Sequence, residues 1–184
     1  MSQQVVLGLT AGIAIYKIPR LVSLLVQNGF EVDVIMTDDA KRFVSPLVFS
    51  TLSKRMVYTD MFDEKTPQPL HIRLATDCSA LFIAPATANT IAKIALGIAD
   101  NLLTAVALAL PPKTPRLVAP SMDENMFLNP ATQANLKTLQ ERGWKVIQPE
   151  SGRLATGKVG KGRMPEPEAL FDCLLSALRK KIRS

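Results

Sequence analysis

Apolar residues in the first 36 positions change from a continuous run to a helical period and then to alternation. The run at residues 5–7 leads into the turn GLTAG at residues 8–12. Apolar positions then recur at helical spacing over residues 15–26, and Asn28-Gly29 is a typical helix end. Residues 31–36 (EVDVIM) alternate polar and apolar side chains. This order predicts a strand, a helix that kinks at Pro19 or begins near it, and a second strand.

The alternation of strands and helices continues along the rest of the chain. Thr37, Asp38 and Asp39 are N-cap candidates for a helix that carries Phe43 and Val44. The pattern also predicts helices at 46–52, 91–96, 101–110, 130–142 and 168–182, and strands at 56–59, 80–84, 116–119 and 145–147. We therefore expect one α/β domain over residues 1–184, a Rossmann/flavodoxin-like open parallel sheet with helices on both faces.

Composition narrows the class of protein only slightly. A net charge of +6 suits an anionic ligand or nucleic acid, but 7 Phe, 2 Tyr and 1 Trp are too few for base-stacking platforms. Cys78 and Cys173 lie far apart in apolar stretches, which favours structural burial and supplies no metal site. No apolar run is long enough for a membrane span, and the first residues lack a signal-peptide pattern. We expect a cytoplasmic protein that binds neither nucleic acid nor membrane.

Candidate chemistry follows from the fold class, because ligands of such sheets bind beyond the carboxyl ends of the strands. The turn after the first strand offers amides at a helix N-terminus, where a phosphate would bind. It matches neither GxGxxG nor GxxxxGK[ST], and packing alone would also explain its small residues. Thr87 and Asn89 either hold a phosphate or heterocycle or cap the next helix. The segments at the expected binding edge are 8–14, 37–43, 85–89, 120–127 and 151–164.

Three ionisable residues are candidates for acid–base chemistry. His71 is the only histidine, and a free imidazole titrates near pH 6.5, so it suits proton transfer as well as a plain structural role. Asp123 and Glu124, in PSMDEN, form either an acid–base pair or a helix N-cap. The spacing of these residues does not decide between the two interpretations.

Five motifs in the chain resemble those of the flavin-dependent cysteine decarboxylases. This family contains phosphopantothenoylcysteine decarboxylase and the peptidyl-cysteine decarboxylases of lantibiotic synthesis. The similarity runs from about residue 5 to residue 167, and it is greatest to the coenzyme A pathway members, which are often the N-terminal half of a bifunctional decarboxylase and synthetase. The motifs are GLTAGIAIYK from Gly8, HIRLA from His71, APATANTIAKIALGIADNLL from Ala84, PSMDENMFLNPAT from Pro120 and SGRLATGKVGKGRMPEP from Ser151.

The resemblance implies FMN bound between the subunits of a homotrimer, and trimers of this family commonly form dodecamers. It also implies the chemistry, in which the flavin oxidises the cysteine side chain to a thioaldehyde and the carboxylate then leaves as CO₂. Phe43 would lie beside the flavin ring. The other residues that the resemblance assigns to FMN are Thr10, Gly12, Ile13, Ala14, Thr37, Ala86, Thr87, Ala88, Asn89 and Thr104.

The same resemblance assigns catalytic roles to His71, Asp123 and Thr156, two of which depart from the usual pattern. Asp123 replaces an asparagine that faces the substrate carboxylate, so an ionised Asp123 would repel that group. Thr156 replaces a cysteine that donates a proton in the reductive step, and a hydroxyl is a poorer acid than a thiol. Substrate contacts would come from Met122, Asp123, Asn125 and Arg163, although Arg163 also fits a solvated flap.

Three functions are compatible with these departures. The first is decarboxylation of 4′-phosphopantothenoylcysteine to 4′-phosphopantetheine by a subtype in which another group donates the proton, with a fused or separate synthetase as partner. The second is oxidative decarboxylation of a peptide that ends in cysteine. The third is an FMN-binding regulatory subunit with little activity. The first is the function we expect.

Overall fold

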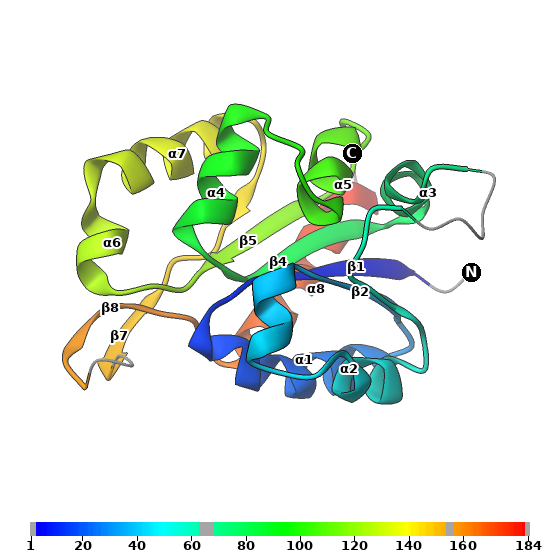
Figure 1. Cartoon of the computed structure of the whole chain (residues 1–184), viewed down its shortest axis with the longest axis horizontal. Coiled ribbons are helices and arrows are strands. Elements are labelled where there is room, and N and C mark those ends of the chain that lie inside the picture. Colours follow the sequence, from blue (N-terminus) through cyan, green and yellow to red (C-terminus); the bar gives the residue numbers. More distant parts are fainter. Residues whose placement is uncertain (1–2, 63–67, 154–156, 183–184) are drawn as a thin grey trace.

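A six-stranded parallel sheet forms the centre of the computed structural model, which describes residues 3–62, 68–153 and 157–182 (Figure 1). The strand order across the sheet is β3-β2-β1-β4-β5-β6. Every pair in it is parallel, as the alternation of strands and helices predicted. The strands are β1 (Gln4–Leu9), β2 (Glu31–Met36), β3 (Val57–Tyr58), β4 (Ala80–Ala86), β5 (Arg116–Pro120) and β6 (Lys145–Val146).

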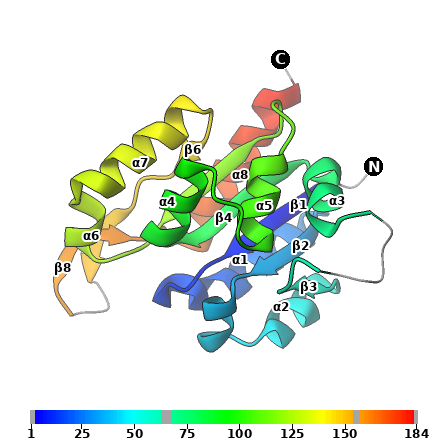
Figure 2. The ribbon, with the colours of Figure 1, turned by 45° about the horizontal axis from the view of Figure 1, so that its top comes forward.

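Helices cover both faces of this sheet, which confirms the predicted fold class (Figures 1 and 2). On one face α1 (Ile18–Gln27), α2 (Pro46–Ser53) and α8 (Pro167–Ile182) pack against the sheet. The opposite face carries α3 (Leu70–Asp77), α4 (Ala88–Leu96), α5 (Leu102–Ala109) and α7 (Pro130–Glu141). Within the described ranges, no helix combines the length and the apolar character needed to cross a bilayer.

The central strands are buried on both faces because each face has its own apolar core. Successive side chains of a strand point to opposite faces, so Val5 and Leu7 join the α1–α8 core while Val6 joins the core under α3, α4 and α5. β4 is buried along its whole length. Burying one such side chain contributes about 1.5–3 kcal/mol, so these three residues alone anchor β1 firmly between the layers.

Pro19 marks the start of an α-helix, as one of the two sequence interpretations predicted. The turn after β1 becomes the short 3-10 helix η1 (Ile13–Lys17), and Pro19 occupies the first turn of α1, where its missing amide proton costs no hydrogen bond. Gly29, with φ 82°, then ends α1 in the left-handed region that glycine favours.

Two segments differ from the sequence expectation. The helix predicted to carry Phe43 is the 3-10 helix η2 (Asp38–Arg42), which ends before Phe43 and leaves that ring half exposed. The alternating run at residues 31–36 forms β2 as predicted, but its polar residue Asp33 is fully buried. Its carboxylate accepts hydrogen bonds from Gln4 and from Arg55 (2.7 Å), and the bond to Asp33 raises the pKa of the Arg55 guanidinium.

Two further elements were not predicted. A short helix, α6 (Glu124–Leu128), follows β5, and the described part of the glycine-rich segment contributes to an antiparallel pair of strands, β7 (Glu150–Arg153) and β8 (Val159–Arg163), which we call the hairpin. The hairpin lies beside α6 at one end of the molecule, whereas α3 lies at the other end (Figure 1).

The strand order leaves a crevice between β1 and β4. From β1 the chain moves outward through β2 and β3, and it then returns to the other side of β1 as β4. The loops that follow β1 and β4 therefore diverge at their carboxyl ends, which is where ligands bind in open α/β sheets.

Candidate active site

A buried threonine holds together the two loops that border the crevice. The Thr10 hydroxyl donates to the Pro85 carbonyl (2.7 Å) and accepts from the Thr87 amide (3.0 Å). Thr10 is almost fully buried. Both bonds join the end of β1 to the end of β4, so Thr10 fixes the distance between the two loops. We call residues 10–14 and 87–89 the switch-point loops.

Each switch-point loop ends at the N-terminus of a helix. A helix leaves its first amides without partners inside the helix, and in η1 these include the amides of Ile13 and Ala14. At α4 the Thr87 side chain accepts from the Thr90 amide (3.3 Å), so Thr87 is an N-cap as one interpretation predicted. The amides of Ala88 and Asn89 also belong to the first turn of α4, between Thr87 and Thr90. Two adjacent helix N-termini favour an anionic group.

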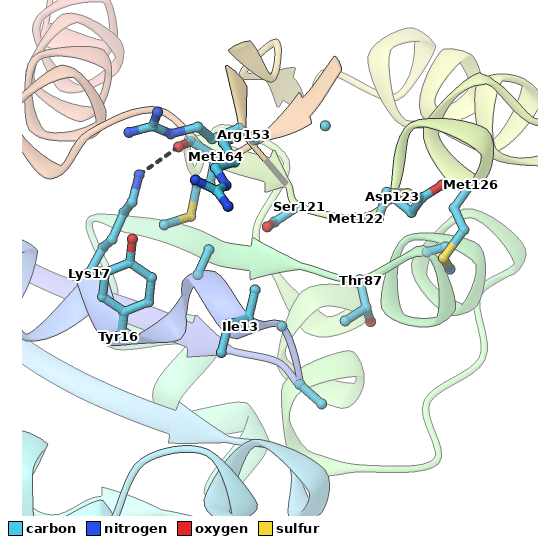
Figure 3. A pocket seen from close by; sticks show the side chains of 16 residues that line it. Ile13, Tyr16, Lys17, Thr87, Ser121, Met122, Asp123, Met126, Arg153 and Met164 are labelled. Atoms are coloured by element: carbon cyan, nitrogen blue, oxygen red, sulfur yellow. Dashed lines mark hydrogen bonds between the residues drawn. The ribbon is translucent and has the colours of Figure 1, made fainter. Parts of the chain in front are cut away.

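A cavity of about 560 Å³ opens beside these loops, a volume within the usual range of ligand pockets (Figure 3). Ala11 also lines a cavity of about 490 Å³ with Phe43, and one of about 240 Å³ with Thr37 and Asn89. The three cavities therefore meet at the turn after β1. The large cavity is lined by residues 11–14, Tyr16, Lys17, Thr87, Ala88, residues 121–123, Met126, Arg153 and residues 162–164.

The opposite side of the large cavity is built by residues 121–124 together with β7 and β8, which we call the hairpin wall. The Met122 amide donates to the Gly162 carbonyl (3.2 Å), and the Lys161 amide donates to the Glu124 carboxylate (2.8 Å). Gly162 has φ 147°, and a Cβ built on it would lie 2.2 Å from the Met122 carbonyl oxygen. Only glycine therefore allows β8 to approach the chain after β5 this closely.

Asp123 and Glu124 do not form an acid–base pair with each other. The Asp123 Oδ1 accepts from the Asn125 amide (2.9 Å) and caps α6, whereas Glu124 holds the hairpin through Lys161. The N-cap interpretation is confirmed. Asp123 nevertheless lines the large cavity, so one carboxylate both caps a helix and faces the ligand space.

A cationic group that sequence reasoning missed lies at the end of the cavity away from Asp123. The Lys17 ammonium donates to the Glu166 carboxylate (2.8 Å) and to the Met164 carbonyl (3.2 Å), and Arg163 donates to the same carboxylate. The hydrogen bond from Lys17, assisted by the one from Arg163, lowers the pKa of Glu166 below the ordinary carboxyl value. The signal in the sequence was one lysine inside the apolar run IAIYKIP.

The fold brings most of the predicted site residues to this crevice. Phe43 lines the second cavity. Thr10, Thr37 and Asn89 line the smallest one. The large cavity collects Gly12, Ile13, Ala14, Thr87, Ala88, Met122, Asp123 and Arg163.

The other predicted residues lie outside these three cavities. Ala86 is buried at the end of β4, and the Thr104 hydroxyl forms a capping box with Asn101 at the start of α5. The Asn125 backbone amide donates a hydrogen bond to the Asp123 carboxylate. Thr156 falls outside the described residues.

His71 occupies the first turn of α3, far from the hairpin wall, and among the described residues it lines none of the three cavities (Figure 1). The helix around it is fixed by Arg73, whose guanidinium donates to the Tyr58 hydroxyl (3.3 Å) and lies 5.7 Å from the centre of that ring. Within a single chain, His71 therefore lies away from the cavity beside the switch-point loops.

Comparison with known proteins identifies close relatives. The chain is 42% identical over 172 residues to a probable phosphopantothenoylcysteine decarboxylase of Streptococcus mutans, covering 93% of this chain and 96% of that protein. It is 47% identical over 168 residues to the coenzyme A biosynthesis bifunctional protein CoaBC of Bacillus subtilis, covering 91% of this chain but 41% of that protein. The chain thus spans less than half the length of that bifunctional relative.

Solved structures agree with the sequence comparison. A PPC decarboxylase variant in complex with pantothenoylaminoethenethiol superposes with a TM-score of 0.88 at 32% identity, covering 96% of this chain and 98% of the other. The FMN-dependent cysteine decarboxylase SpaF superposes with a TM-score of 0.83 at 27% identity, covering 98% and 97%. The Flavoprotein family profile matches residues 1–179. The chain therefore belongs to the flavoprotein family, among the flavin-dependent cysteine decarboxylases.

Proposed function

We propose that the chain decarboxylates the cysteine moiety of 4′-phosphopantothenoylcysteine to 4′-phosphopantetheine in coenzyme A biosynthesis. The bond between the cysteine Cα and its carboxylate breaks, CO₂ leaves, and a proton takes its place on Cα. The observation that carries the proposal is the single cavity shared by the switch-point loops and the PSMDEN segment. These two regions hold two of the motifs by which the chain resembles the decarboxylases, and the 42% identical relative carries that name.

The residues of the crevice fit FMN as the cofactor. Backbone amides at two helix N-termini suit a phosphate monoester, and the cavities that meet at Ala11 offer apolar and polar walls for a heterocycle. Ile13, Ala14, Thr37 and the loop at 86–89 would hold it, with Phe43 at the ring. When bound, FMN accepts two electrons from the cysteine side chain and returns them after CO₂ has left.

Thr10 acts in this proposal as a positioning residue rather than as a ligand. Its hydroxyl already makes two hydrogen bonds that join β1 and β4. It therefore sets the spacing of the amides that receive the cofactor. Thr104 has a local role instead, because its hydroxyl belongs to the capping box with Asn101 at the start of α5.

Asp123 orients the cysteine end of the substrate. One of its carboxylate oxygens accepts from the Asn125 amide, and within the described residues the other has no hydrogen-bond partner. Because Asp123 lines the large cavity, this second oxygen would accept a hydrogen bond from an N–H or S–H group of the substrate. A carboxylate is better suited to these donors than to the substrate carboxylate, which it would repel. The backbone amides of Met122 and Asn125 hold Asp123 in position, since the first donates to the Gly162 carbonyl and the second to Asp123 itself.

His71 manages protons in the cavity of a neighbouring subunit. It lies on α3, away from the cavity of its own chain, whereas Ile13, Tyr16 and Phe43 expose 55%, 64% and 49% of their surfaces at the cavity edges. Exposed apolar side chains around a polar site favour a covering protein surface. A homotrimer would bring the partner's His71 to that surface, where its imidazole nitrogen holds or moves a proton.

The test is to mix the FMN-loaded protein with 4′-phosphopantothenoylcysteine and follow CO₂ release and product mass. Release of CO₂ with the saturated thiol as product supports the proposal. A product lighter by two hydrogens would instead support the oxidative reaction of the peptidyl-cysteine enzymes. Binding of FMN without any product would leave a flavin-binding subunit. The same product mass shows whether a chain with Thr156 completes the reductive step.

A synthetase that joins cysteine to phosphopantothenate is the expected partner, and the reaction belongs in the cytoplasm. The bifunctional relatives are named as coenzyme A biosynthesis proteins, and this chain spans 41% of one and 45% of another. Adding a purified synthetase with phosphopantothenate, cysteine and a nucleoside triphosphate should give phosphopantetheine in one vessel.

A further inference from the structure

The large cavity is electrically polarised. Lys17 and Arg153 lie on one side of it, and Asp123 and Met126 lie on the other (Figure 3). Arg163 belongs to the first side, because it shares the Glu166 carboxylate with Lys17. We call Lys17, Arg153, Arg163 and Glu166 the cationic end.

Charges at the cationic end do not balance. This end contains three cations, two of which contact its one carboxylate, so two positive charges remain at neutral pH. Several donors also remain unused. The Lys17 ammonium has three donors and makes two hydrogen bonds, while Arg153 has no hydrogen bond or ion pair within the described residues. A dianion with several acceptor oxygens would complement this end in both charge and hydrogen bonding.

Burial makes Lys17 the strongest of these cations. Its side chain is 6% exposed, whereas that of its partner Glu166 is 49% exposed. Charges interact more strongly where water is excluded, so an anion that enters the cavity gains more from Lys17 than from a surface lysine. Removing water from an ammonium is also costly, and one half-exposed carboxylate compensates only part of that cost.

We propose that the cationic end binds the phosphate monoester of the substrate, so that Lys17, Arg153 and Arg163 determine specificity for a phosphorylated compound. The inference deepens the proposed function and depends on it for the identity of the substrate. A phosphate monoester carries about −1.5 to −2 charges and three acceptor oxygens at pH 7, which matches the net charge and the spare donors. The cysteine end of the substrate then lies toward Met122 and Asp123, across the cavity.

A purely structural role for Lys17 makes a different prediction. The Lys17–Glu166 pair joins η1 to the chain after β8 and so could simply attach the hairpin wall. If attachment were its whole role, removing either partner would have the same effect. If Lys17 binds phosphate, Glu166→Gln removes the opposing charge and leaves phosphate binding as strong or stronger.

The experiment measures binding of 4′-phosphopantothenoylcysteine and of its dephosphorylated form to the FMN-loaded protein by isothermal titration calorimetry. Each charge-assisted contact is worth about tenfold or more in affinity. Lys17→Gln and Arg153→Gln should therefore each lower the preference for the phosphorylated form by about tenfold. Arg20→Gln is the matched control, because Arg20 pairs with Glu168 one turn further along, outside the cavity lining. It should change the preference by less than about twofold.

Three results would overturn the inference. An unchanged preference in both Lys17→Gln and Arg153→Gln would remove these cations from phosphate recognition. Equal losses in Lys17→Gln and Glu166→Gln would leave only the attachment role. Loss of FMN from Lys17→Gln during gel filtration would assign the cations to the phosphate of the cofactor. Because binding is measured without turnover, a wild-type protein that binds but decarboxylates neither compound would contradict the proposed function alone.

Discussion

The switch-point loops and the hairpin wall border the same cavity, but they are held in place by different means. The loops are joined through the buried Thr10 hydroxyl and emerge directly from the two central strands. The hairpin wall is attached at its edges, through the Gly162 carbonyl, the Lys161 amide and the Lys17–Glu166 pair. Val159 at the start of β8 is 79% exposed.

This difference indicates a division of roles between the two regions. A change in the switch-point loops disturbs the packed core, so groups fixed there keep one position, as a resident cofactor requires. We expect the hairpin wall, which is attached at its edges, to adjust with less effect on the core, as suits a substrate that must enter and leave. The predictions below test this division, beginning with the largest expected effect.

His71 lies in neither region and tests whether the two regions suffice for turnover. His71→Asn should leave FMN bound and lower decarboxylation by about 10²- to 10⁴-fold, because it removes the group that we propose transfers the proton. Bound flavin by absorbance and CO₂ release by a coupled assay would check this. Full turnover by the variant would remove histidine from the mechanism.

Thr10→Val should disturb the cofactor side. It leaves the Pro85 carbonyl and the Thr87 amide without their buried partner, so the melting temperature should fall by about 5–10 °C and FMN should be lost on dialysis. Thr10→Ser, which keeps the hydroxyl, is the control and should retain FMN. Normal flavin content in Thr10→Val would show that the loops are positioned without this bridge.

Gly162→Ala should disturb the substrate side alone. Its methyl group would collide with the Met122 carbonyl and push β8 away from residues 121–124. We expect KM to rise by about tenfold while FMN content stays normal. Gly29→Ala is the control for positive φ without a clash, because nothing lies within 4 Å of its Cβ, and it should leave KM unchanged. A loss of flavin in Gly162→Ala would contradict the division of roles.

Asn89→Asp tests whether the smallest of the three cavities takes part in binding the cofactor. Three carboxylates, of Asp38, Asp39 and Asp100, already line it, and a fourth would oppose an anionic cofactor. FMN should dissociate roughly fivefold faster, which corresponds to about 1 kcal/mol. Asn129→Asp, at the N-cap of α7, makes the same change outside the three cavities and should leave flavin retention unaltered. Equal retention in both variants would argue against cofactor at this cavity.

Acid should weaken the attachment of the hairpin wall slightly. Hydrogen bonds from Lys17 and Arg163 lower the pKa of Glu166 in the folded protein. The ionised Glu166 therefore stabilises the fold fully above the pKa of an unfolded glutamate, about 4.3. This stabilisation is lost as the pH falls through the lower pKa of the folded protein. Because Glu166 is half exposed, the contribution is under about 1 kcal/mol. Urea unfolding of wild type and Glu166→Gln at pH 3 and 7 would check this, and a difference that grows at pH 3 would contradict it.

Local patterns predicted the parallel sheet well but not the interactions that act between distant segments. The bounds of β2 match the alternating run at residues 31–36. Its buried Asp33 was not predicted, because the compensating Arg55 lies 22 residues later. No role was predicted for Lys17, since its partner Glu166 is 149 residues away.

The candidate site was predicted more fully by resemblance than by patterning. Loops at strand ends were identified from the fold class alone, but the hairpin of β7 and β8 was missed. Its residues, ESGR and VGKGR, are poor strand formers, and the hairpin is held by α6 rather than by its own side chains. The contact between β8 and α6 decides which residues line the same cavity. No single stretch of the sequence encodes that contact.

The contact between residues 17 and 166 draws the last part of the chain back to its first turn. A protein that ended between residues 147 and 160 would keep the amides of η1 and α4 but lose Arg163, Met164 and the partner of Lys17. Such a fragment would present half a pocket, open on one side to water. Both halves of the proposed site therefore form only when nearly the whole polypeptide is present.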